Sequence, residues 1–177
     1  MSATTMLLRD LLAGIPGRDS GGDIMVSGLQ IDSRRVLPGH AFVALAGSRA
    51  HGITFAPAAV ARGASVILAE APVRAAPEID APVIWIEGLR ARAGDLAARF
   101  FGQPSRGMTV IGITGTNGKT SSVQMLAQAL EYLGHRAATI GTLGSGLAGA
   151  MQPGERTTPD AIHTQELLAG FRDAGAT

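Results

Sequence analysis

The sequence contains no cysteine, and it has few aromatic or charged residues. With no cysteine among 177 residues, the chain can form no disulfide scaffold, no thiolate zinc site and no cysteine nucleophile. Charged side chains make up 16% and the formal net charge is +1. A net charge so close to zero argues against a protein that binds nucleic acid through a basic field. We therefore expect no nucleic-acid partner.

Long apolar runs are also absent. None approaches the roughly 18 residues that a membrane-spanning helix needs, and Arg9 and Asp10 interrupt the apolar stretch near the N-terminus, which argues against a signal peptide. A cytoplasmic protein without a membrane span is therefore expected. What the chain does have is 46% hydrophobic residues and 24 glycines. This composition favours a globular protein with a buried core over a disordered one.

Strand-like and helix-like segments alternate along the chain, which is typical of an α/β fold. Helices are predicted at 6–15, 55–62 and 89–101, and strands at 28–32, 41–45, 65–69 and 82–86. Helical spacing is clearest in the last of these helices, whose expected buried residues are Leu89, Ala93, Leu96, Ala97 and Phe100.

A polar stretch with glycine and proline, 102–107, is the best candidate for a linker. It predicts two domains, 1–105 and 106–177. In the second, strands are predicted at 108–113 and 137–140, a helix at 119–133, and a glycine-rich loop at 141–154. Thr158-Pro159-Asp160 has the pattern of an N-cap, a first-turn proline and an acidic residue that open a helix to about Asp173.

The most specific motif is Gly-Ile-Thr-Gly-Thr-Asn-Gly-Lys-Thr-Ser at 112–121, placed between the predicted strand and helix. Glycines let backbone N–H groups close around phosphate oxygens, and the helix N-terminus adds its dipole. In such a loop Lys119 would neutralise phosphate charge and the Thr120 hydroxyl would bind Mg²⁺. The motif is a variant, because five residues rather than four separate Gly112 from Gly118.

The acidic residue that usually completes such a magnesium site is missing from the rest of the chain. No apolar strand after Thr120 ends in Asp or Glu. The stretch 108–177 is also short for a complete nucleotide-binding sheet with helices on both faces. We therefore expect the chain to stop inside its second domain.

The loop text Gly-Thr-Asn-Gly-Lys-Thr resembles the ATP loop of the Mur ligases, the ATP-dependent amide-forming enzymes of peptidoglycan synthesis. Asp32-Ser33-Arg34, Pro38-Gly39 and 42–45 are similar to the UDP-binding domain of the members that add the third residue or the D-Ala-D-Ala dipeptide. The Thr-Thr-Pro text at 157–159 resembles the third-residue branch. The resemblance implies a small N-terminal UDP-binding α/β domain, followed by the first part of the family's central P-loop-type domain.

The family's reaction phosphorylates the D-glutamate carboxylate of UDP-MurNAc-L-Ala-D-Glu with ATP and Mg²⁺, and the amine of a diamino acid, meso-diaminopimelate or L-lysine, then attacks the acyl phosphate. By resemblance, Lys119 is the catalytic residue and Thr120 the metal ligand. The ATP-binding residues would be Gly115, Thr116, Asn117, Gly118, Lys119, Thr120 and Ser121. The substrate-binding residues would be Ile31, Ser33, Ser48, Arg49, Ala50, Thr157 and Thr158.

The family's next motif, with its magnesium glutamate, would follow residue 177, so this chain by itself is expected to show no ligase activity. Two other functions remain open at this point. One is a non-catalytic module that binds a UDP-sugar or nucleotide. The other is the ligase that adds D-Ala-D-Ala, which accepts a tripeptide rather than a dipeptide substrate.

Other patterns support simpler interpretations. Gly144-x-Gly146-x-x-Gly149 matches a dinucleotide fingerprint, but Pro153-Gly154 follows where a helix should open, so a loop is predicted. The four histidines lack metal-ligand spacing. Arg90, Arg92 and Arg99 are expected to form a solvated helix face. Without the resemblance, Asp32-Ser33-Arg34 would be a strand-end turn held by an Asp–Arg pair, and Thr157-Thr158 a helix cap.

Overall fold

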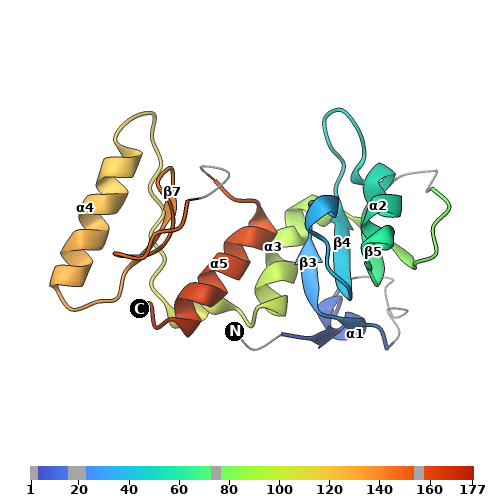
Figure 1. Ribbon diagram of the computed structural model, residues 1–177, viewed down its shortest axis with the longest axis horizontal. Helices are drawn as coiled ribbons and strands as arrows, with labels where there is room; N and C mark the ends of the chain where they lie inside the picture. The colour runs from blue at the N-terminus through green and yellow to red at the C-terminus, as the bar shows by residue number, and fades with distance from the viewer. Residues whose placement is uncertain (1–3, 16–22, 73–76, 154–157) are drawn as a thin grey trace. The chain divides into compact units, whose positions relative to one another are not determined.

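A computed structural model of the chain describes residues 4–15, 23–72, 77–153 and 158–177 (Figure 1). The fold is α/β, as predicted, and its main sheet is parallel. The chain separates into two compact units, a first unit that ends at Phe100 and a second unit, Phe101–Thr177. The division lies just ahead of the expected linker. No helix in the described ranges is long and apolar enough to cross a bilayer.

The first unit is built on a parallel sheet of four strands. These are β3 (Gly28–Gln30), β4 (His40–Ala44), β5 (Val66–Ala71) and β6 (Val83–Glu87), and their order in the sheet is their order in the chain. Gln30 lies opposite Phe42, and Ala44 opposite Ala69. The four strands predicted for this part of the sequence are confirmed. Because all four run the same way, their carboxyl ends meet at one edge of the sheet.

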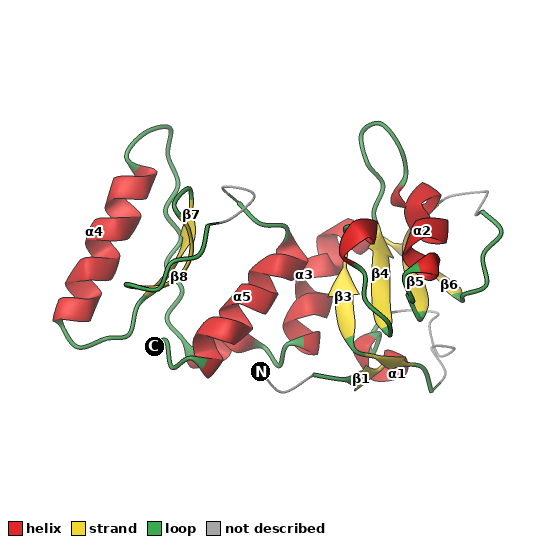
Figure 2. Cartoon of the chain, in the orientation of Figure 1, coloured by secondary structure: helices red, strands yellow, loops and turns green. Residues whose placement is uncertain are grey.

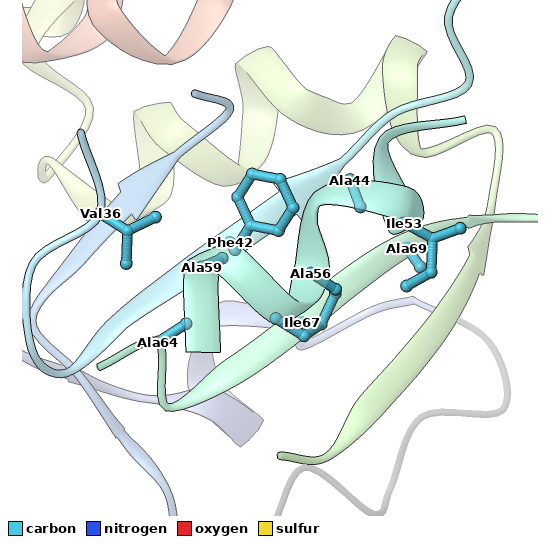
Figure 3. Packing of buried hydrophobic residues seen from close by; sticks show 9 residues of the cluster. All are labelled: Val36, Phe42, Ala44, Ile53, Ala56, Ala59, Ala64, Ile67 and Ala69. Carbon is cyan, nitrogen blue, oxygen red and sulfur yellow. The ribbon is translucent and has the colours of Figure 1, made fainter. Parts of the chain in front are cut away.

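Both faces of this sheet are covered. On one face, Phe42 and Ala44 of β4 and Ile67 and Ala69 of β5 pack in one cluster with α2 (Ala56–Ala61), as Figure 3 shows. The residues that alternate with them, Ala41, Val43, Val66 and Leu68, are buried as well. This double burial explains why the strands are almost continuously apolar in sequence.

Helix α3 (Leu89–Phe100) contacts β5, and all five of its expected apolar residues are buried. The helix predicted at 6–15 is mostly wrong. Met6–Leu7 is strand β1, paired with β2 (Met25–Val26), and α1 (Leu8–Leu11) is a single turn. Pairing with a distant strand outweighed the weak local preference of so short a helix.

The described part of the second unit contains two α-helices and a β-hairpin. Helix α4 (Lys119–Tyr132) and α5 (Ala161–Asp173) were expected, and β7 (Ala138–Gly141) coincides closely with a predicted strand. β7 packs against α4 and its partner β8 (Gly144–Leu147) contacts α5, so the hairpin lies between the helices (Figure 2).

β8 corrects the expectation of a loop at 141–154, and it also accounts for the false dinucleotide fingerprint. Gly144 has φ +108°, and a Cβ there would stand 2.0 Å from the Gln152 carbonyl oxygen. The chain at Gln152 is hydrogen-bonded to Ser145 in both directions, at 2.9 Å each. Glycine at this position therefore allows the segment around Gln152 to approach closely, and it does not indicate a cofactor site.

The strand predicted at 108–113 is wrong, because this segment pairs with no described strand. Val110 is 58% and Ile111 54% exposed. A strand is stabilised by a partner ladder, which an apolar sequence alone does not supply. The expected linker, by contrast, is folded. Its 3₁₀ turn η3 (Pro104–Gly107) contacts α5, and the Arg172 guanidinium donates to the Phe101 carbonyl at 3.0 Å.

Candidate functional site

The expected UDP-contact residues follow the carboxyl ends of two neighbouring strands. Ile31 and Ser33 come directly after β3, and 48–50 follow β4. Adjacent parallel strands place these segments at one edge of the sheet, where ligands bind in open α/β folds. Figure 1 shows the loop between β4 and α2 extending well past the end of β4.

The turn after β3 is held by an Asp–Arg pair. Asp32 accepts from the Arg34 backbone N–H at 2.9 Å and forms an ion pair with its guanidinium at 2.6 Å. The side-chain hydrogen bond from Arg34 is the main cause that lowers the pKa of Asp32 to about 2. Ser33 begins the 3₁₀ turn η1 (Ser33–Arg35), and its hydroxyl has no hydrogen-bond partner among the described residues. The pair thus shapes the turn while Ser33 stays available to a ligand.

In the loop after β4, some residues likewise hold the backbone while others remain exposed. Ala46 and His51 pair as an isolated bridge, and Gly47 N–H donates to the Ala50 carbonyl at 3.0 Å. His51 accepts from Ile53 N–H at 3.0 Å, so the ring helps to start the 3₁₀ turn η2 (Gly52–Phe55). At the tip, Ser48 and Arg49 are exposed, and their side chains bond to nothing in the described parts of the chain.

The phosphate-loop motif lies at the start of α4. Gly118 is the residue before the helix, and its φ of +77° lies in the left-handed region that residues other than glycine rarely adopt. The Lys119 ammonium turns back over its own loop and donates to the carbonyls of Gly115 and Thr116. The basic group is therefore already at the mouth of the loop formed by 115–118.

A hollow of about 120 Å³ opens beside this loop. Lys119 and Thr120 line it, and so does Thr158, which was expected to bind the muramyl-dipeptide end of the substrate. The hollow is completed by Ile113, Val123, Gln124, Ile140, Gly141, Thr142, Leu143 and Gly144. The other expected threonine, Thr157, lies outside the described residues.

Thr142 was missed by the sequence reasoning. The Thr120 hydroxyl, the expected magnesium ligand, donates to the Thr142 hydroxyl at 3.4 Å. Thr142 stands in the turn between β7 and β8, directly after a strand that was predicted. Its position after the carboxyl end of a strand was the signal that could have identified it.

The two helices of this unit begin differently, and the difference bears on phosphate binding. At α5, Asp160 accepts from the N–H groups of Ile162 and His163 at 3.0 and 2.9 Å, so Asp160 is the cap rather than the expected Thr158. At α4, Gly118 supplies no side-chain cap. Uncapped N–H groups beside an ammonium form a donor set that suits a phosphate anion.

Magnesium ligation is only partly represented. The Thr120 hydroxyl is a suitable oxygen ligand. Within the described ranges, however, no group of three or more His, Asp or Glu side chains is arranged to hold a metal ion. A site here would thus depend on Thr120, phosphate oxygens and water.

The arginines of α3 lie on a largely solvated face, as expected: Arg90 and Arg92 are exposed and Arg99 is half-buried. Each of them also donates to backbone carbonyls, which was not expected. Arg99 donates to the carbonyls of Leu11 and Ala13 at 2.7 and 2.6 Å. Arg92 reaches the Glu87 carbonyl at 3.3 Å, and Arg90 the Ala46 carbonyl at 2.5 Å. Each therefore ties a piece of backbone to the helix.

Comparison with known proteins agrees with these features. The description "Mur ligase family, catalytic domain" matches residues 25–101, and "Mur ligase middle domain" matches 113–177. UDP-N-acetylmuramoyl-L-alanyl-D-glutamate--2,6-diaminopimelate ligase of Xanthomonas campestris pv. campestris (strain 8004) is 57% identical over 154 residues, which cover 87% of this chain and 31% of that protein. The Xylella fastidiosa (strain 9a5c) protein of the same name is 50% identical over 172 residues, 97% of this chain and 34% of its own length.

Solved structures give the same result. A structure of UDP-N-acetylmuramoyl-L-alanyl-D-glutamate--2,6-diaminopimelate ligase matches 98% of this chain and 34% of its own with a TM-score of 0.80 and 29% identity. MurF from Acinetobacter baumannii, at 24% identity and a TM-score of 0.59 over 96% of this chain and 34% of its own, shares the fold. The chain spans about a third of the length of the relatives it matches. Its two matched regions together cover most of its residues, and the chain belongs to the Mur ligase family.

Proposed function

We propose that this chain supplies the UDP-substrate site and the ATP-phosphate site of a ligase that adds 2,6-diaminopimelate to UDP-MurNAc-L-Ala-D-Glu. The observation that carries the proposal is the shared hollow, in which Thr158 stands with Lys119 and Thr120. A carboxylate becomes an acyl donor only after phosphorylation, so the substrate's carboxylate and the ATP γ-phosphate must meet. One hollow lined by both sets of residues supports that meeting.

At the phosphate site, the uncapped N–H groups of α4 and the Lys119 ammonium would bind and orient the phosphates. Their positive charge screens the negative charge that develops during phosphoryl transfer. The Thr120 hydroxyl would hold Mg²⁺, which supplies further charge neutralisation when bound. In the first unit, Ser33 and the loop 48–50 would hold the UDP end, with Ile31 beside them. These roles are consistent with a reaction in the cytoplasm, where ATP is the energy source.

The names of the relatives favour diaminopimelate over lysine as the added residue, and favour a dipeptide substrate over the tripeptide used for D-Ala-D-Ala addition. No observation favours a purely non-catalytic module.

Lys119 offers a direct test, because it is the only lysine in the sequence. Amine-directed acylation followed by mass spectrometry therefore reports on one side chain and the N-terminus. MgATP should protect Lys119 and leave the N-terminal amine reactive. UTP at the same concentration serves as a control for unspecific triphosphate binding. Equal labelling with and without MgATP would contradict the ATP site.

A chimera tests the reaction itself. The matching segment of the Xanthomonas campestris ligase would be replaced by the segment of this chain that aligns with it. The chimera should release phosphate only when ATP, UDP-MurNAc-L-Ala-D-Glu and diaminopimelate are all present. A chimera that folds, binds both nucleotides and yet works only with the tripeptide and D-Ala-D-Ala would overturn the assignment.

A further inference from the structure

Three residues from separate elements form a closed ring of hydrogen bonds at the base of the loop after β4. Glu70 of β5 accepts from Ala46 N–H at 2.9 Å through one carboxylate oxygen and from Arg90 N–H at 3.1 Å through the other. The Arg90 guanidinium completes the ring by donating to the Ala46 carbonyl at 2.5 Å. Ala46 therefore has both of its backbone polar groups tied to side chains of the sheet and of α3.

Glu70 also holds the other end of the loop, through its backbone carbonyl. The His51 ring nitrogen Nε2 lies 2.9 Å from the Glu70 carbonyl oxygen, and Nδ1 accepts from Ile53 N–H. Nε2 therefore carries the ring hydrogen and donates a hydrogen bond to the Glu70 backbone carbonyl. Ala46 and His51 are paired with each other. Both ends of the segment 46–51 are thus anchored on Glu70, one through its carboxylate and one through its backbone.

Glu70 is well placed for this task. It lies in a strand flanked on both sides, opposite Ile86 of β6. Its carboxylate accepts from an N–H of the first turn of α3, a position where the helix dipole favours negative charge. Because the anchor is part of the sheet, the loop is held in one position relative to the end of β3, where Ser33 stands.

We propose that Glu70 is a positioning residue for the UDP-binding loop: without contacting the ligand, it holds 46–51 so that Ser48, Arg49 and Ala50 face the nucleotide. This inference rests on the proposed UDP site. A purely structural role for Glu70 would lower stability and leave affinity unchanged. A positioning role lowers affinity even in fully folded protein, because the loop must then be ordered at the expense of binding.

The test compares Glu70→Gln with Arg99→Gln in the full chain. An amide in place of the carboxylate can accept from only one of the two N–H groups and turns an NH₂ toward the other. Arg99→Gln removes backbone tethers from the same helix, but these hold 11–13 rather than the loop. Affinity for UDP-MurNAc-L-Ala-D-Glu, and for UDP alone, is measured by calorimetry at a temperature where every variant is folded.

We expect Glu70→Gln to lower the affinity for both ligands by about tenfold, the loss expected for one unsatisfied N–H group. Arg99→Gln should stay within about twofold of the unmodified chain. Hydrogen exchange should accelerate at the amides of 47–51 in Glu70→Gln and in Arg90→Gln, and not in Arg99→Gln. Arg90→Gln is the second variant should Glu70→Gln fail to fold, and it should also weaken UDP binding.

The outcomes separate the two proposals. If the unmodified chain binds neither ligand, the proposed UDP site is wrong and this inference falls with it. If it binds and the folded Glu70→Gln or Arg90→Gln variant binds equally well, only the positioning role is overturned. A loss of affinity of the same size in Arg99→Gln would also overturn it, since that result would reflect general loosening of α3.

Discussion

The two units present their candidate binding loops in opposite ways. In the first unit, the loops after β3 and β4 are held by Asp32, His51 and Glu70, none of which is an expected ligand contact. In the second unit, the loop before α4 is held chiefly by Lys119, the residue expected to bind the ligand. The phosphate loop should therefore change its internal contacts on binding, while the UDP loops should change little.

The cores differ as well. The sheet of the first unit is covered on both faces, whereas the second unit exposes Val110 and Ile111 and has only a two-stranded hairpin in its described part. Burial of apolar surface is the main source of stability, so the first unit should be the more stable. The following predictions test this difference, from the largest effect to the smallest.

Phe42→Ala should destabilise the first unit by about 3–5 kcal/mol, because Phe42 is 1% exposed and its removal leaves a cavity. Ile111→Ser should change the free energy of unfolding of the second unit by about 0.5 kcal/mol or less. Urea unfolding followed by residue-resolved hydrogen exchange measures both. Equal losses for the two variants would show that Ile111 is buried in solution.

Lys119→Ala should weaken MgATP binding by roughly 100-fold, the range expected for loss of hydrogen bonds from a charged group. Binding of UDP should be unchanged, because the UDP residues lie in the other unit. Calorimetry with each nucleotide gives the comparison. Full retention of MgATP affinity would remove Lys119 from the site.

Asp160→Ala should cost about 1 kcal/mol of stability in the second unit, since two N–H groups of α5 lose their cap. Asp160→Asn is the matched control, because asparagine caps nearly as well. Thermal unfolding of both variants measures the loss. If Asp160→Asn were as unstable as Asp160→Ala, the charge rather than the cap would be responsible.

Asp32 should make stability depend weakly on pH. Its pKa is lowered from 3.8 to about 2 in the folded chain, so the ionised form stabilises the fold above about pH 4, and this contribution is lost as the pH falls through 2. Arg34 is 82% exposed, which limits the effect to about 1 kcal/mol or less. Asp32→Asn should therefore be less stable than the unmodified chain at pH 6, and the difference should shrink toward pH 2. A difference that is independent of pH would contradict this assignment.

Local patterns were sufficient for some features. The helical spacing of apolar residues in α3 predicted its buried face, and the motif at 112–121 predicted a loop that opens α4 at Lys119. In both cases the signal is contained within one or two turns of chain. The turn after β3 was also accessible, because Asp32 and Arg34 are neighbours in sequence.

Other features were inaccessible because they depend on distant partners. The strand β8 was not predicted because its glycines are typical of a loop. In the structure they allow the segment at Gln152 to approach closely. The segment 108–113 has the composition of a strand and lacks a pairing partner in the described structure. The arginines of α3 are largely in solvent, as expected, but their contacts were not predicted, since nothing nearby in sequence indicates the carbonyls of Leu11, Ala13 and Ala46.

The sequence by itself therefore determined the family, the order of most helices and strands, and the chemistry of the phosphate loop, since residue types and short spacings carry these. Only the tertiary structure decided that Thr142 meets Thr120, that Thr158 shares a hollow with Lys119, and that Glu70 anchors both ends of the loop after β4. The reason is physical. Hydrogen bonds between residues 19 to 44 positions apart form only after strand pairing has brought their backbones together. No local sequence pattern predicts such contacts.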